Sequence, residues 1–159
     1  MAAPVIPPGG RVPDDCALFR ALNPKHYEDG LPGDNHFVME QSHPQDDGVS
    51  MAITELITLE QFRGLSSLTS RYGEAFGVAE LNVGEILEPV QSTWISVRQK
   101  DDPLWGDCVS AHAIVTGYQM LTGASGKKRI LEFQRHLVQL ARKNFHPPVP
   151  PPPPVAPQV

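Results

Sequence analysis

The segment VSMAIT (residues 49–54), followed closely by TLEQ (residues 58–61), contains the two patterns that predict the class of fold. Val49, Met51 and Ile53 alternate with small residues, which is the period-two pattern of a strand with one buried face. The second stretch starts with a hydroxyl residue and has glutamine three residues later, the pattern of a helix capping box. A strand followed directly by a capped helix indicates a domain that contains both kinds of element.

Outward from this stretch, the same patterns predict further elements. Strands are expected at residues 76–81, 93–98 and 111–116, and a short buried strand at residues 36–39. Residues 16–22 fit either a strand or a helical turn. The helix that begins at Thr58 is expected to reach Gly73, a residue typical of a helix C-terminus. Its expected buried stripe consists of Phe62, Leu65, Leu68 and Tyr72.

A second amphipathic helix is predicted over residues 126–144. Its apolar residues share one face, at Ile130, Phe133, Leu137, Leu140 and Ala141. Strands and helices do not alternate regularly along the chain, which argues against a doubly wound parallel sheet. We therefore predict an α+β fold: a small single domain with a mostly antiparallel sheet of four to six short strands, one central helix and one C-terminal amphipathic helix.

Proline divides the chain into three parts. Of the 17 prolines, four lie within residues 1–13 and eight lie between Pro147 and Pro157. We predict a disordered Pro/Gly leader over residues 1–13, a globular α+β domain over residues 14–145, and a Pro-rich polyproline II tail over residues 146–159.

Charge and hydropathy limit the function classes. The net charge of −5 argues against a nucleic-acid-binding protein, although residues 127–143 hold six basic residues and one acidic residue. No apolar run approaches the roughly 20 residues that span a bilayer, and the first ten residues lack the features of a secretory signal. We expect a cytoplasmic protein without membrane contact, in which Cys16 and Cys108 are reduced thiols.

Cys16 and His112 form the first candidate site. A thiol hydrolase needs a cysteine whose pKa is lowered by an imidazole, often at a helix N-terminus. The stretch DCALF (residues 15–19) is expected to open a helix, and His112 begins an apolar strand. These two pieces resemble the NlpC/P60 cysteine peptidases, although the serine-glycine that usually follows the cysteine is absent. The resemblance implies a thiol nucleophile with a histidine base. The alternative is that both are structural residues of the core.

The segment GASGKKR (residues 123–129) forms a second candidate, because cations and free backbone N–H groups at a helix start favour anions. It is not a Walker A loop, since position 121 is leucine and no Ser or Thr follows the lysines. We predict anion or partner binding by the basic residues of this helix, with a solvated helix start as the alternative. These residues are Lys127, Lys128, Arg129 and Arg135.

The third candidate is Arg20 with the irregular loop at residues 23–36, which carries His26, Tyr27 and His36. A basic residue followed by His, Tyr and a long loop is similar to the arrangement in ADP-ribosyl-transfer folds. His26, His36 and His43 also lie close together in sequence, but their spacings of ten and seven fit no metal motif. We therefore predict no metal and no cofactor.

These observations favour a binding or adaptor domain that acts through protein–protein or anion contacts. A protein partner would be contacted by the segment from Pro147 to Pro154 or by the basic helix at residues 126–144, as in an antitoxin-like regulator. The alternative is a small enzyme, either a thiol hydrolase that uses Cys16 and His112 or a transferase that uses Arg20 and the loop at residues 23–36.

Overall fold

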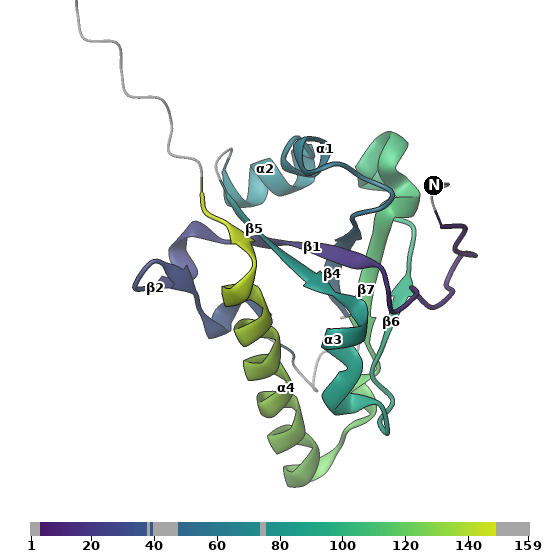
Figure 1. Ribbon diagram of the computed structural model, residues 1–159, viewed down its shortest axis with the longest axis vertical. Helices are drawn as coiled ribbons and strands as arrows, with labels where there is room; N and C mark the ends of the chain where they lie inside the picture. Colours follow the sequence, from purple (N-terminus) through teal and green to yellow (C-terminus); the bar gives the residue numbers. More distant parts are fainter. Residues whose placement is uncertain (1–3, 38, 40–47, 74–75, 149–159) are drawn as a thin grey trace, which may run out of the picture.

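The centre of the molecule is a six-stranded antiparallel sheet with the strand order β6-β7-β4-β1-β5-β8 (Figure 1). The computed structural model describes residues 4–37, 39, 48–73 and 76–148. The predicted α+β class is confirmed, with mixed helices and strands in one small chain. The strands of the sheet are β1 (Ala17–Leu22), β4 (Val49–Ile53), β5 (Gly77–Asn82), β6 (Ser96–Gln99), β7 (His112–Thr116) and β8 (Phe145–His146).

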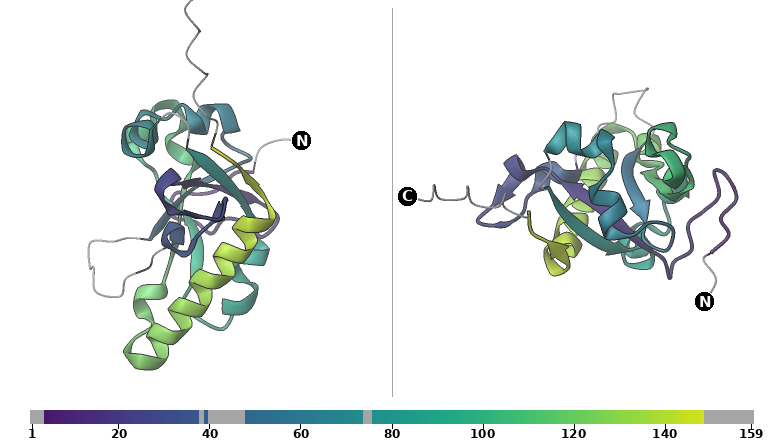
Figure 2. Two further views of the ribbon diagram at one scale, coloured as in Figure 1. Left: turned by 90° about the vertical axis from the view of Figure 1, so that its left-hand side faces the viewer. Right: turned by 90° about the horizontal axis from the view of Figure 1, so that it is seen from above.

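The central strands β1, β4 and β5 divide their side chains between two cores. In β4, Met51 and Ile53 belong to the core under the C-terminal helix α4 (Gly123–Lys143), whereas Ala52 belongs to the core on the opposite face. The predicted buried stripe of α4 is confirmed, because all five of its apolar residues are buried. Figure 2 shows α4 on one side of the strands and the helices α1 (Leu59–Arg63) and α2 (Ser66–Tyr72) on the other.

The predicted central helix starts as expected but is interrupted. Thr58 Oγ1 accepts from Gln61 N at 3.0 Å, and Gln61 Oε1 accepts from Thr58 N at 2.9 Å, so the capping box is confirmed. A single helix from Thr58 to Gly73 is wrong. Gly64 ends α1, and Leu65 takes an extended backbone angle (ψ 120°) that separates α1 from α2. Gly73 does lie at the C-terminus of α2, at a φ of 85° that favours glycine.

A small hairpin and several short helices connect the main elements. The hairpin pairs β2 (Tyr27–Glu28) with β3 (Leu31–Pro32). The strand expected at residues 36–39 is wrong for the part described, because His36 N donates to Gly33 O and closes a turn of 3-10 helix instead. The remaining elements are η1 (Pro24–His26), η2 (Asp34–Phe37), α3 (Val83–Leu87), η3 (Glu88–Val90), η4 (Pro103–Ala111) and η5 (Tyr118–Met120).

Both proline-rich ends of the chain are attached to the sheet by the residues next to the globular domain. Val12 is buried and its N–H donates to Val97 O of β6, while Gly10 O accepts from Gln99 N. This segment therefore differs from the disordered leader expected over residues 1–13. Strand β8 pairs with β5 just before the tail, and most of the predicted polyproline segment, residues 149–159, lies outside the described residues. None of the described helices has the length and apolar character needed to cross a membrane.

Candidate functional site

The candidate site lies where β1 and β4 separate. These strands pair only at Leu18–Ile53 and Phe19–Ala52, although β1 pairs with β5 along its whole length. Beyond the last pair, the Arg20 guanidinium occupies the gap. Its Nη1 donates to Ser50 O at 2.8 Å, and its Nε and Nη2 donate to His36 O at 3.1 and 2.9 Å. One side chain thereby fixes β1, β4 and η2 relative to one another.

A cavity of about 400 Å³ opens beside this guanidinium, and we call it the arginine cleft. Its volume lies within the range of small-molecule sites. Arg20 comes from β1 and the exposed Arg71 comes from α2, so two cations face the same space. Among the described residues, those that line the cleft include no carboxylate: they are Arg20, Ala21, Asn23, His26, His36, Arg71 and Tyr72. The charge of the cleft favours an anion.

His36, a lining residue of the arginine cleft, has an unsatisfied polar atom. The residue is only 2% exposed, and its buried Nε2 has no hydrogen-bond partner among the described residues. Its ring packs edge-on against Tyr27 at 5.4 Å and against His26 at 5.8 Å. Burial, reinforced by Arg20 and His26, lowers the pKa of His36 to about 4. A neutral, unpartnered imidazole in a cationic cleft is a ready hydrogen-bonding group for a ligand.

A smaller cavity of about 40 Å³ shares lining residues with the cleft and is also lined by Ser50, and we call it the serine pocket. Ser50 Oγ lies 2.6 Å from His112 Nε2, and His112 Nδ1 lies 2.6 Å from Lys100 O. Because a carbonyl can only accept, Nδ1 carries the proton and Nε2 accepts from the serine hydroxyl. The serine pocket is lined by Arg20, Ala21, Ser50, Met51, Phe62, Leu68, Arg71, Tyr72 and Trp105.

The His112 ring is held firmly in this position. It is 6% exposed, and the Trp105 ring packs edge-on against it at 4.8 Å. Burial lowers the pKa of His112, although the hydrogen bond to Lys100 O opposes that effect. The imidazole is therefore neutral at pH 7 and able to accept a proton from Ser50.

Of the predicted site residues, the structure brings Arg20, His26 and His36 together around one cavity, and the Tyr27 ring packs against the His36 ring.

The structure does not bring Cys16 and His112 together as a catalytic pair. Cys16 precedes strand β1 instead of opening a helix, because residues 17–22 alternate between the two cores of the sheet. Burial, together with Glu55 and Asp15, raises the pKa of Cys16 to about 11. The ring nitrogens of His112 contact Ser50 and Lys100 instead.

The Cys16 thiol is therefore expected to be inert in the native protein. At pH 8, alkylation of Cys16 by iodoacetamide should be about 100-fold slower than in the urea-unfolded chain, because a pKa raised by about two units lowers the thiolate fraction accordingly. Site-resolved mass spectrometry measures this rate, with the half-buried Cys108 as an internal reference. Equal rates in native and unfolded protein would contradict the expectation.

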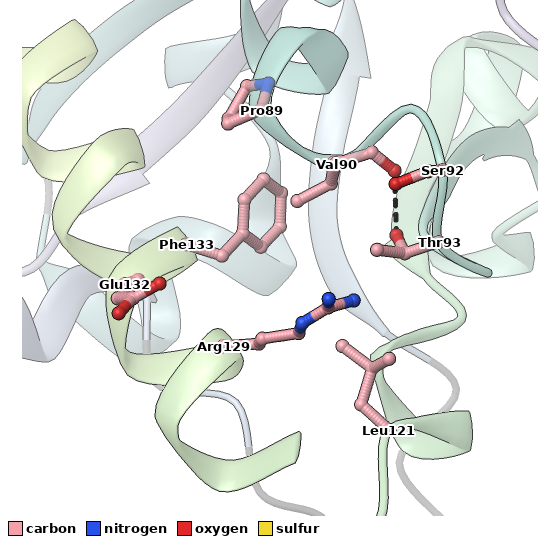
Figure 3. A pocket seen from close by; sticks show the side chains of 8 residues that line it. All are labelled: Pro89, Val90, Ser92, Thr93, Leu121, Arg129, Glu132 and Phe133. Atoms are coloured by element: carbon pink, nitrogen blue, oxygen red, sulfur yellow. Dashed lines mark hydrogen bonds between the residues drawn. The ribbon is translucent and has the colours of Figure 1, made fainter. Parts of the chain in front are cut away.

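The basic residues of α4 lie apart from the arginine cleft. Because the helix starts at Gly123, the triplet at residues 127–129 falls in its second turn instead of at its N-terminus. Arg129 lines a separate cavity of about 290 Å³, and in Figure 3 it extends toward Thr93. Glu132, one turn further along, also lines that cavity and offsets the positive charge. Lys127, Lys128 and Arg135 are exposed.

The described residues contain no group of three His, Cys, Asp or Glu side chains that could hold a metal ion. His43, the third histidine considered for a metal site, lies outside the described residues. No family model, curated protein or solved structure matches this chain.

Proposed function

We propose that this protein is a binding domain for a small ligand that carries a phosphate or carboxylate group, held in the arginine cleft. One observation carries the proposal: Arg20, Arg71 and the buried His36, whose Nε2 has no hydrogen-bond partner among the described residues, line the same cavity, and none of its described lining residues is a carboxylate. A guanidinium presents several N–H donors in one plane, a geometry that matches the oxygens of phosphate and carboxylate groups.

The two arginines have different roles in this proposal. Arg20 is fixed by the carbonyl oxygens of His36 and Ser50, so it supplies a positive charge in a constant position. Arg71 is exposed on α2, where its guanidinium packs 5.3 Å from the Tyr72 ring, and it reaches the ligand from that helix. The neutral His36 adds a hydrogen bond from the buried end of the cleft.

Titration calorimetry with inorganic phosphate tests the proposal. The substitution Arg71→Gln should weaken phosphate binding by about tenfold or more, because it removes a charge-assisted contact without disturbing a buried group. Arg129→Gln is the matched control, since it removes the same charge from the exposed face of α4. Binding that is absent in the natural chain, or reduced equally by both substitutions, would overturn the proposal.

A protein partner with an acidic surface is the second candidate, supported by the exposure of four cations along α4. They are Lys127, Lys128, Arg129 and Arg135. The segment from Pro147 to Pro154 would add a second contact, as a ligand for an aromatic groove. The control above separates the two candidates, because anion binding that is lost in Arg129→Gln and kept in Arg71→Gln favours the α4 face.

A further inference from the structure

The hydrogen bond between Ser50 and His112 has the geometry of a nucleophile and its base. Nucleophilic serines are activated by an imidazole within hydrogen-bond reach, which is itself oriented by a third group. Here the Oγ–Nε2 distance is 2.6 Å, and Lys100 O orients the ring through Nδ1. The carbonyl fixes the same tautomer that a carboxylate fixes in a serine hydrolase, without adding a negative charge.

Ser50 also has access to a ligand in the arginine cleft. Its side chain lines the serine pocket, which shares Arg20, Arg71 and Tyr72 with the larger cleft. The serine pocket, at about 40 Å³, has room for only a few atoms next to Oγ. A molecule with a small reactive group and an anionic part would place the first beside Ser50 and the second between the arginines.

We propose that Ser50 is a catalytic nucleophile and His112 its general base, in the hydrolysis of small acyl esters that carry an anionic group. The preference for an anionic substrate rests on the proposed function of the arginine cleft, whereas the Ser50–His112 pair stands on its own geometry.

In the first step, Ser50 Oγ attacks the carbonyl carbon and its proton passes to His112 Nε2. The ester C–O bond then breaks, and the departing alcohol oxygen takes the proton from Nε2. In the second step, a water molecule gives a proton to Nε2 and attacks the acyl-serine. Ser50 Oγ leaves with that proton, so the products are one carboxylic acid and one alcohol. The charge that develops on the carbonyl oxygen lies in a pocket lined by two guanidinium groups, which favour it.

Covalent labelling and turnover test the proposal in the full chain. Methanesulfonyl fluoride, a small serine-directed reagent, should modify Ser50, as located by mass spectrometry. Hydrolysis of the anionic ester 4-acetoxybenzenesulfonate should fall on the order of 100-fold or more in Ser50→Ala and in His112→Gln. Ser70→Ala and His136→Gln are matched controls outside both cavities and should keep the activity. Unchanged turnover in Ser50→Ala would overturn the proposal.

A second variant distinguishes loss of catalysis from loss of folding. In Ser50→Cys, iodoacetamide should alkylate the new thiol faster than it alkylates Cys108. Adding His112→Gln to Ser50→Cys should slow the alkylation of the new thiol. Equal rates in the single and the double variant would overturn the base role of His112. Phosphate titration separates this proposal from the first. If Ser50→Ala binds phosphate but has no turnover, both proposals are supported. If Ser50 is labelled but phosphate does not bind, only the anion-binding function fails.

Discussion

The variant Arg20→Ala is expected to lose measurable phosphate binding and to be about 2–4 kcal/mol less stable than the natural chain. Arg20 donates to the carbonyl oxygens of both His36 and Ser50 at the point where β1 and β4 separate. Without the guanidinium, the carbonyl oxygens of His36 and Ser50 lose a charged hydrogen-bond donor. The ends of β1 and β4 that do not pair with each other also lose the side chain that connects them. Urea denaturation measures the loss of stability, and calorimetry measures the loss of binding.

Two further variants define the cause of that loss. Arg20→Lys keeps the charge but cannot donate to His36 and Ser50 through a planar fork, so it should recover only part of the stability. Arg135→Ala removes an exposed arginine from α4 and should change stability by no more than about 0.5 kcal/mol. If Arg20→Ala were as stable as Arg135→Ala, the connecting role of Arg20 would be refuted.

Acidification is expected to destabilise the protein through His36. The pKa of His36 is lowered from 6.5 to about 4 in the folded state, so the unfolded chain binds the proton more readily. The stability is therefore fully present above pH 6.5 and is lost as the pH falls toward 4, by about 3 kcal/mol in total and about 2 kcal/mol between pH 7 and pH 5. The lowered pKa of His112 acts in the same direction.

Denaturation of the natural chain and of His36→Phe at several pH values isolates this contribution. Phenylalanine keeps a flat ring against Tyr27 and removes both the titration and the unpartnered Nε2. The variant should lose about 2 kcal/mol less than the natural chain between pH 7 and pH 5. Parallel stability curves for the two proteins would show that His36 is not the group responsible.

Local patterns in the sequence were sufficient for much of the fold. The alternation in residues 49–54 predicts β4, the pair Thr58 and Gln61 predicts the start of α1, and the apolar face of residues 126–144 predicts α4. Each of these signals depends on residues within a few positions of one another. The sequence does not reveal the break between α1 and α2, because Leu65 fits a continuous helical stripe with Phe62 and Leu68, and only the folded chain shows that the helix ends at Gly64 and restarts after Leu65.

The site was predicted only in part, because its residues meet through strand pairing. Arg20, His26 and His36 are close in sequence, and this closeness predicts that they lie together. The pattern of residues 49–54 identifies Ser50 only as a small residue on one face of a strand, and nothing in these residues shows that α2 and η4 cover this face. Strands β4 and β7 pair so that Ala52 is opposite His112. This register brings His112 into contact with Ser50, although the two residues are 62 positions apart in the sequence.

An NMR titration of the full ¹⁵N-labelled chain with inorganic phosphate tests directly whether the arginine cleft is an anion-binding site. We expect saturable shifts at the amides of Arg20, His36 and Arg71 and at their neighbours, and these shifts should disappear in Arg71→Gln. Shifts confined to residues 123–135 of α4, or no saturable shift at any amide, would contradict the claim.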